Sequence, residues 1–137
     1  MITDANGLPL LVHTTPANVR DDQPTLAMVA RMPAIQGPRG RPRRKPTALC
    51  GDRGYGFPYL IAAIVTLGIV SMLSPRGAEH GGGLGTVRYV VERTLAWFGH
   101  ARRLKLCYER TGVHFQAFHD LAACLICANR LKRFNEL

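Results

Sequence analysis

The sequence predicts an α/β fold in which short strands and helices alternate over residues 1–137. Two observations indicate this class. A hairpin signal, Asn6-Gly7, stands near the start, and two later apolar segments bounded by glycine have the length of short buried strands, each followed by residues with helical spacing. Hydrophobic residues make up 47% of the chain and charged residues 20%, so wholesale disorder is excluded. A chain of this length can form about one domain.

The first predicted elements are a hairpin and a helix. An Asn-Gly pair favours a type I′ turn, because both central residues of that turn have positive φ. Residues 1–5 and 8–14 are therefore expected to pair. Asp21 or Asp22 is expected to cap a helix over about residues 23–32. Because the first arm is so short, the hairpin resembles a strand whose upstream neighbours are missing, and the chain is expected to be truncated.

The next segment, residues 37–46, is a dense basic stretch. Three prolines and two glycines exclude regular structure, so an exposed loop is expected. The formal net charge of +9 indicates a polyanionic partner, either nucleic acid or an anionic membrane surface. A solvated loop is the alternative to phosphate contact. The predicted phosphate-binding residues are Arg39, Arg41, Arg43, Arg44 and Lys45.

Residues 54–75 contain no charged side chain. We expect a strand over 47–50 before this run, and within it a helix over 58–67 and an extended piece over 69–73, divided by Gly68. The alternative is a membrane-associated segment at 57–73, although a span needs about 20 predominantly apolar residues. A loop over 80–85, a long amphipathic helix over 86–106 and a last helix over 114–132 complete the prediction.

Few residues outside this pattern suggest chemistry. Cys124 and Cys127 form a CxxC motif, but no second ligand pair completes a zinc site, so both are expected to be buried small hydrophobic residues. Asp52 ends a predicted strand, and Glu92 lies on a predicted helix. From the residues alone, Asp52 could be a turn residue and Glu92 a surface ion pair. The few cysteines and the absence of a secretory signal favour a cytoplasmic protein.

Taken together, these segments resemble the DDE transposases of bacterial insertion sequences, in the families numbered four and five. The similarity covers essentially the whole chain. It is carried by TDANGLPL, TPANVRD, GPRGRPRRKP, LCGDRGYG, RYVVERTLAWFGHARRLKLCYER and FHDLAACLICANRL. The resemblance implies a ribonuclease-H-like domain that uses two Mg²⁺ ions on three carboxylates to cleave phosphodiesters and transfer DNA strands.

Matched motif by motif, the resemblance makes Asp52 the second and Glu92 the third catalytic and metal-binding carboxylate. It implies DNA as the partner, both the transposon ends and the target, together with an oligomer of the transposase and a nucleoid location. Arginines near Glu92 would line the DNA channel beside Tyr89: Arg88, Arg93, Arg102 and Arg103.

The sequence also departs from the family pattern. The first catalytic aspartate is expected on a strand upstream of the hairpin, and Asp4 lies in the hairpin itself. Gly56 and Phe57 replace polar residues, and Arg20 stands where histidine is common. We therefore expect a chain that is inactive by itself. The alternatives are a fragment that binds DNA or transposase without catalysis, and a small membrane-associated protein using residues 57–73.

Overall fold

The computed structural model describes residues 1–37, 39–75, 77 and 84–135, without the side chains of residues 84–88 and 134–135. The chain forms two compact units. Unit 1 comprises Met1–Pro16 and Tyr89–Leu137, and unit 2 comprises Ala17–Arg88. Helices and short strands occur along the chain, which confirms the mixed α/β character predicted from the sequence.

Unit 1 begins with the predicted hairpin. Strand β1 (Ile2–Thr3) pairs antiparallel with β2 (Pro9–Leu11). The predicted type I′ turn was wrong, because Gly7 has a positive φ (+87°) but Asn6 does not. The Gly7 N–H instead donates to the Asp4 carbonyl (3.1 Å), and Gly7 adopts its left-handed conformation at little cost. The Asp4 carboxylate accepts hydrogen bonds from the backbone N–H groups of Asn6 (2.9 Å) and Leu8 (2.7 Å). Asp4 therefore stabilises the turn.

Three helices follow in the carboxy-terminal half: α3 (Leu84–Gly99), α4 (Arg102–Leu106) and α5 (Gly112–Asn135). The last includes the predicted helix over 114–132. The prediction of one helix over 86–106 was wrong, because Ala101 has extended backbone and separates α3 from α4. The break directly follows Gly99, the weakest helix former in that segment. Residues 80–83 of the predicted loop over 80–85 lie outside the described residues. Residues 84 and 85, the last two of that loop, belong to α3.

Side chains of α3 and α5 hold the hairpin of unit 1 through its backbone. The buried Thr94 hydroxyl donates to the carbonyl of Gly7 (2.7 Å), and Arg93 donates to that of Asn6 (2.7 Å). The Gln116 amide donates to the Val12 carbonyl (3.0 Å) and accepts from the Thr14 N–H (2.7 Å). These hydrogen bonds join segments some 87 to 104 residues apart in the sequence.

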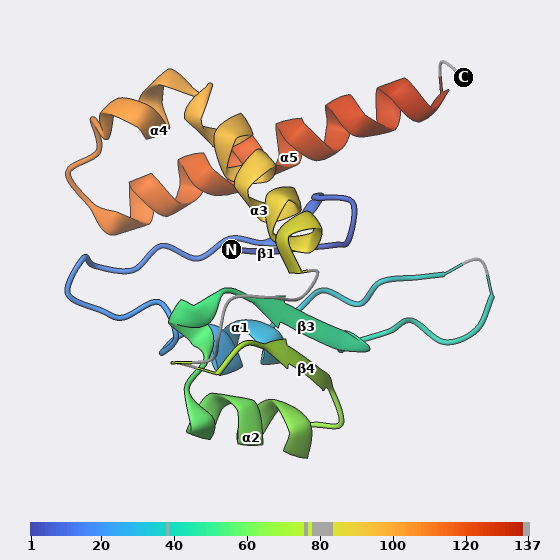
Figure 1. Ribbon diagram of the computed structural model, residues 1–137. Helices are drawn as coiled ribbons and strands as arrows, with labels where there is room; N and C mark the ends of the chain where they lie inside the picture. The colour runs from blue at the N-terminus through green and yellow to red at the C-terminus, as the bar shows by residue number, and fades with distance from the viewer. Residues whose placement is uncertain (38, 76, 78–83, 136–137) are drawn as a thin grey trace. The chain divides into compact units, whose positions relative to one another are not determined.

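Unit 2 is built on a strand–helix–strand motif (Figure 1). Strand β3 (Ala48–Gly51) pairs in parallel with β4 (Val70–Leu73), and α2 (Pro58–Thr66) connects them. Parallel strands require such a crossover. These elements confirm the predictions over 47–50, 58–67 and 69–73, except that β3 is half-buried rather than buried. With α1 (Thr25–Ala30), they bury one apolar core: Met28, Val29, Leu60, Ile64, Ile69 and Leu73.

The uncharged run at 54–75 therefore supplies the core of unit 2. Helix α2 has nine residues, and the chain turns at Gly68 into β4. Among the described residues, no helix is both long and apolar enough to cross a membrane. The interpretation of residues 57–73 as a helix followed by a strand is confirmed.

The prediction that Asp21 or Asp22 caps α1 was wrong. The helix begins after Pro24 without a side-chain cap. Asp22 is buried and instead accepts two hydrogen bonds from the Arg20 guanidinium (3.0 and 2.8 Å) and one from the Tyr59 hydroxyl. The Arg20 hydrogen bonds lower the pKa of Asp22 from 3.8 to about 2. These stronger, charge-assisted donors occupy the carboxylate that would otherwise cap the helix.

Candidate catalytic carboxylates and nucleic-acid interface

Asp52 directly follows β3 in unit 2. It precedes a short 3-10 helix, Arg53–Tyr55, and its Oδ1 accepts a hydrogen bond from the Gly54 N–H (2.8 Å). Its side chain is exposed. The carboxyl end of a parallel strand is the place where α/β sheets commonly present functional side chains. Asp52 thus combines a local turn role with an accessible carboxylate at the end of the strand.

Two further carboxylates, those of Asp21 and Asp22, act together with Asp52 on the neighbouring Tyr55. Burial raises the pKa of Tyr55, and the negative charges of Asp21, Asp52 and Asp22 raise it further. Asp21 and Asp52 are exposed, whereas Asp22 is buried against Arg20. Three aspartates of unit 2 therefore act electrostatically on Tyr55, which ends the 3-10 helix after Asp52. No local pattern could have indicated this, because Asp21 and Asp52 are far apart in the sequence.

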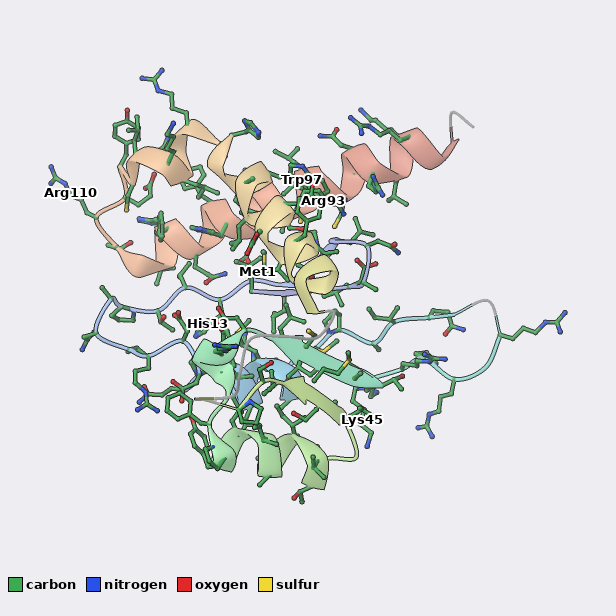
Figure 2. The ribbon with its side chains drawn as sticks, viewed as in Figure 1. Met1, His13, Lys45, Arg93, Trp97 and Arg110 are labelled. Carbon is green, nitrogen blue, oxygen red and sulfur yellow. The ribbon has the colours of Figure 1, made fainter. Side chains whose placement is uncertain are left out.

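Glu92 lies on α3 in unit 1, and its side chain is exposed. Among the side chains that the structure describes, it makes no ion pair, and the Arg88 side chain lies outside that description. Its neighbour Arg93 does not pair with it. Arg93 donates to Asn6 and lies over the rings of Tyr89 (5.8 Å) and Trp97 (5.3 Å). Arg93 and Trp97 are labelled near each other in Figure 2.

The predicted basic loop at 37–46 is confirmed as an exposed segment over its described residues. A pair of backbone hydrogen bonds between Ile35 and Arg43 (2.8 and 2.9 Å) closes it. Lys45 differs from the four arginines of the loop, because its Nζ donates a hydrogen bond to the Leu67 carbonyl at the end of α2 (2.8 Å). The exposed arginines of the loop are Arg39, Arg41, Arg43 and Arg44.

The predicted channel arginines of unit 1 also differ in their surroundings. Arg102 is exposed on α4. Arg103 forms a salt bridge with Glu109 (2.6 Å) and lies over the ring of Phe118 (4.3 Å), while its side chain remains 56% exposed. Arg93 is committed to the hairpin through its hydrogen bond to Asn6. The structure therefore favours Arg102 over Arg93 and Arg103 as a cation available to a ligand.

The four cysteines are free thiols. The expectation that both CxxC residues are buried was wrong for Cys124, which is exposed, as is Cys107. Cys127 is half-buried, and burial raises the pKa of its thiol. Its Sγ lies 3.8 Å from the Pro9 carbonyl oxygen. The two cysteines of the CxxC motif therefore differ from each other in exposure, although they lie on one helix.

The donor set of the two candidate carboxylates suits a hard cation. Asp52 and Glu92 offer carboxylate oxygens, the ligands that Mg²⁺ prefers. Within the described residues, however, no three His, Cys, Asp or Glu side chains are grouped to hold a metal ion. The two carboxylates belong to different units. The donor chemistry is suitable, and each unit contributes one of the two candidate carboxylates.

The chain belongs to the transposase DDE domain family, whose model matches residues 1–127. The family is generally dependent on divalent metal ions. The chain is also 43% identical over 136 residues to a Burkholderia cepacia protein whose name designates it a putative transposase for insertion sequence element IS402. The match covers 99% of this chain and 64% of that protein, so the chain spans less than two-thirds of its relative's length. No solved structure matches the chain.

Proposed function

We propose that this chain acts in DNA transposition as part of the catalytic domain of a DDE transposase, with a ribonuclease-H-like architecture. Asp52 and Glu92 would be its second and third metal-binding carboxylates. The observation that carries the proposal is the family match over 1–127, together with the exposure of both carboxylates. On this proposal the chain would be found with DNA in the cytoplasm.

The same proposal predicts that residues 1–137 do not cleave DNA by themselves. Two-metal cleavage needs ligands for both ions, which the family is expected to supply with three carboxylates. The first of these is expected on a strand upstream of the hairpin. Asp4 does not replace it, because its carboxylate binds the turn at Asn6 and Leu8. A further polypeptide segment carrying that aspartate would be needed for strand transfer.

DNA binding would remain without that segment. The exposed arginines of the basic loop and Arg102 are the cations best placed to contact phosphates. Binding of this kind releases condensed counterions, so affinity falls steeply with salt. The fragment that binds DNA without catalysis is therefore the second candidate function, and the exposure of the loop supports it.

The salt dependence of DNA affinity tests the proposed interface. Fluorescence anisotropy with a labelled duplex would give the slope of log affinity against log salt. A variant with Arg39, Arg41, Arg43 and Arg44 changed to Gln should have a shallower slope, by about 0.9 for each phosphate that the variant no longer neutralises.

Lys45→Gln is the matched control, because Lys45 belongs to the same loop but donates to Leu67. We expect its slope to stay close to that of the unmodified chain. An unchanged slope in the four-arginine variant, or an equal loss in Lys45→Gln, would contradict the role given to the loop.

A further inference from the structure

The basic loop of unit 2 has a defined base and an exposed tip. At the base, Ile35 and Arg43 exchange two backbone hydrogen bonds (2.8 and 2.9 Å), which bring the two arms of the loop together. Figure 1 shows the described part of the loop, in teal, extending away from β3 and β4 of the same unit. The loop tip is defined here as Arg39, Gly40 and Arg41, where the chain bends.

The backbone of the loop tip is held without the side chains of its two arginines. The Gln36 Nε2 donates to the carbonyls of Gly37 and Gly40 (3.0 Å each). Gly40 has a φ of +95°, a conformation that favours glycine, and a Cβ at this position would meet no atom within 4 Å. Arg39 and Arg41 are exposed, and neither forms a salt bridge with a described carboxylate. Both guanidinium groups are therefore available to a ligand.

The side chains of the loop tip suit the narrow groove of DNA. The minor groove is about 6 Å wide, which is too narrow for a helix with a diameter of about 10 Å. Runs of A·T pairs narrow this groove further and strengthen its negative potential, which attracts inserted arginine side chains. Two long cationic side chains stand on either side of Gly40, which has no side chain to hinder close approach of the backbone.

Hydrogen-bond chemistry indicates which base pairs the loop tip prefers. A guanidinium group only donates hydrogen bonds. In the minor groove, A·T pairs present only acceptors, whereas a G·C pair adds the amino group of guanine, which is a donor. The arginines of the tip therefore match an A·T minor groove and are opposed by a guanine amino group. In the major groove the preference is reversed, because arginine there binds O6 and N7 of guanine.

We propose that the loop tip inserts Arg39 and Arg41 into the minor groove of A·T-rich duplex DNA. Arg43 and Arg44, which follow the tip toward the base of the loop, contact the phosphates beside the groove. This inference rests on the proposed role of the basic loop in DNA binding, and it adds the groove that is bound and the base composition that is preferred.

Three duplexes of equal length test the groove and the base preference. Their central base pairs are A·T, G·C or inosine·C. Inosine lacks the amino group of guanine, so an inosine·C pair resembles A·T in the minor groove but keeps the O6 and N7 acceptors of guanine in the major groove. Fluorescence anisotropy at one salt concentration gives the three affinities. We expect the A·T and inosine·C duplexes to bind alike, about tenfold more tightly than the G·C duplex.

Two variants with equal loss of charge locate this preference in the loop. The variant with Arg39→Gln and Arg41→Gln should bind all three duplexes with nearly equal affinity. The matched control carries Arg43→Gln and Arg44→Gln, and it should bind all three more weakly by a similar factor, so that the tenfold preference persists. All four residues are exposed, and circular dichroism establishes that both variants are folded. A preference that survives in the first variant would contradict the assignment to the loop tip.

The outcomes separate this inference from the proposed function. Equal affinity of the unmodified chain for all three duplexes would overturn minor-groove insertion and leave the phosphate contacts of the loop in place. Tighter binding of the G·C and inosine·C duplexes than of the A·T duplex would also overturn it, because that order indicates recognition of guanine in the major groove. Absence of binding to any duplex would contradict the proposed role in DNA binding as well.

Discussion

Each of the two units of this chain is stabilised internally by a different kind of interaction. Unit 2 has an apolar core between α1, α2 and β4, in which Leu60 and Ile64 are fully buried. Unit 1 depends more on polar side chains that bind the hairpin backbone, above all Thr94 and Gln116. Burial of apolar surface is non-directional, whereas each hydrogen bond to a backbone carbonyl requires one defined geometry.

This difference explains why the contacts of unit 2 are easier to predict from the sequence than those of unit 1. The core of unit 2 comes largely from one local run, residues 54–75, which the composition already marks as apolar. The hydrogen bonds of unit 1 join residues about 100 positions apart. Substitutions should therefore damage unit 2 through reduced core volume and unit 1 through the removal of hydrogen bonds.

The largest effect is expected in the core of unit 2. Ile64→Ala removes a fully buried side chain, and we expect the free energy of unfolding to fall by about 3 kcal/mol, through reduced burial and the cavity that remains. Hydrogen exchange read by mass spectrometry would show faster exchange in peptides covering β3, α2 and β4.

Val65→Ala is the matched control, since Val65 is adjacent in α2 but 57% exposed. Its effect should stay within about 0.5 kcal/mol. Equal exchange rates for Ile64→Ala and the unmodified chain would show that this side chain does not support the core.

A smaller effect is expected at Thr94 in unit 1. Thr94→Val keeps the shape but leaves the Gly7 carbonyl without its hydroxyl donor, and it also removes the bond to Val90 (3.0 Å). Leaving a buried acceptor unsatisfied costs about 2 kcal/mol. Trp97, the one tryptophan of the sequence, lies on α3 and reports urea unfolding of this unit by fluorescence.

Thr94→Ser keeps the hydroxyl and should retain most of the stability that Thr94→Val loses. If Thr94→Val keeps its stability while Thr94→Ser loses it, packing of the Thr94 methyl group, which valine keeps and serine lacks, is the source of stability, and the hydrogen bond to Gly7 contributes little.

The smallest effect is a pH dependence in unit 2. The pKa of Asp22 is lowered to about 2 in the folded chain by the Arg20 hydrogen bonds, against 3.8 as its ordinary value. Between those values the unfolded chain binds more protons, so this contribution to stability is present above about pH 4 and is lost as pH falls toward 2. The urea midpoint followed by circular dichroism should decrease over that range.

Asp22→Asn should flatten this dependence, because the side chain no longer titrates. Asp21→Asn removes a charge at the exposed neighbouring position and leaves the Arg20 and Tyr59 hydrogen bonds to Asp22 in place, so the decrease should persist. An unchanged pH profile in Asp22→Asn would contradict the assignment.

The elements with local signals were predicted from the sequence. Asn6-Gly7 indicated the hairpin, and Gly68 divided the apolar run where α2 and β4 are divided in the structure. Predictions failed where a distant partner decides the outcome. Asp21 or Asp22 was expected to cap α1, yet Arg20 and Tyr59 occupy the Asp22 carboxylate.

The candidate site shows the same limit. A motif identified Asp52 and Glu92, and local reasoning placed them correctly at a strand end and on a helix. Their roles as metal ligands remain a prediction. The raised pKa of Tyr55 reflects burial first and then the charges of Asp21, Asp52 and Asp22, and no spacing rule relates Asp21 and Asp22 to Asp52.

The most direct test of the central claim measures DNA binding and DNA nicking on the same supercoiled substrate with Mg²⁺. We predict that residues 1–137 bind the DNA but leave it intact, and that Asp52→Ala changes neither result by more than a small amount. Robust nicking that Asp52→Ala and Glu92→Gln both abolish would contradict the need for a further carboxylate. Absence of DNA binding at low salt would contradict the proposed role in transposition.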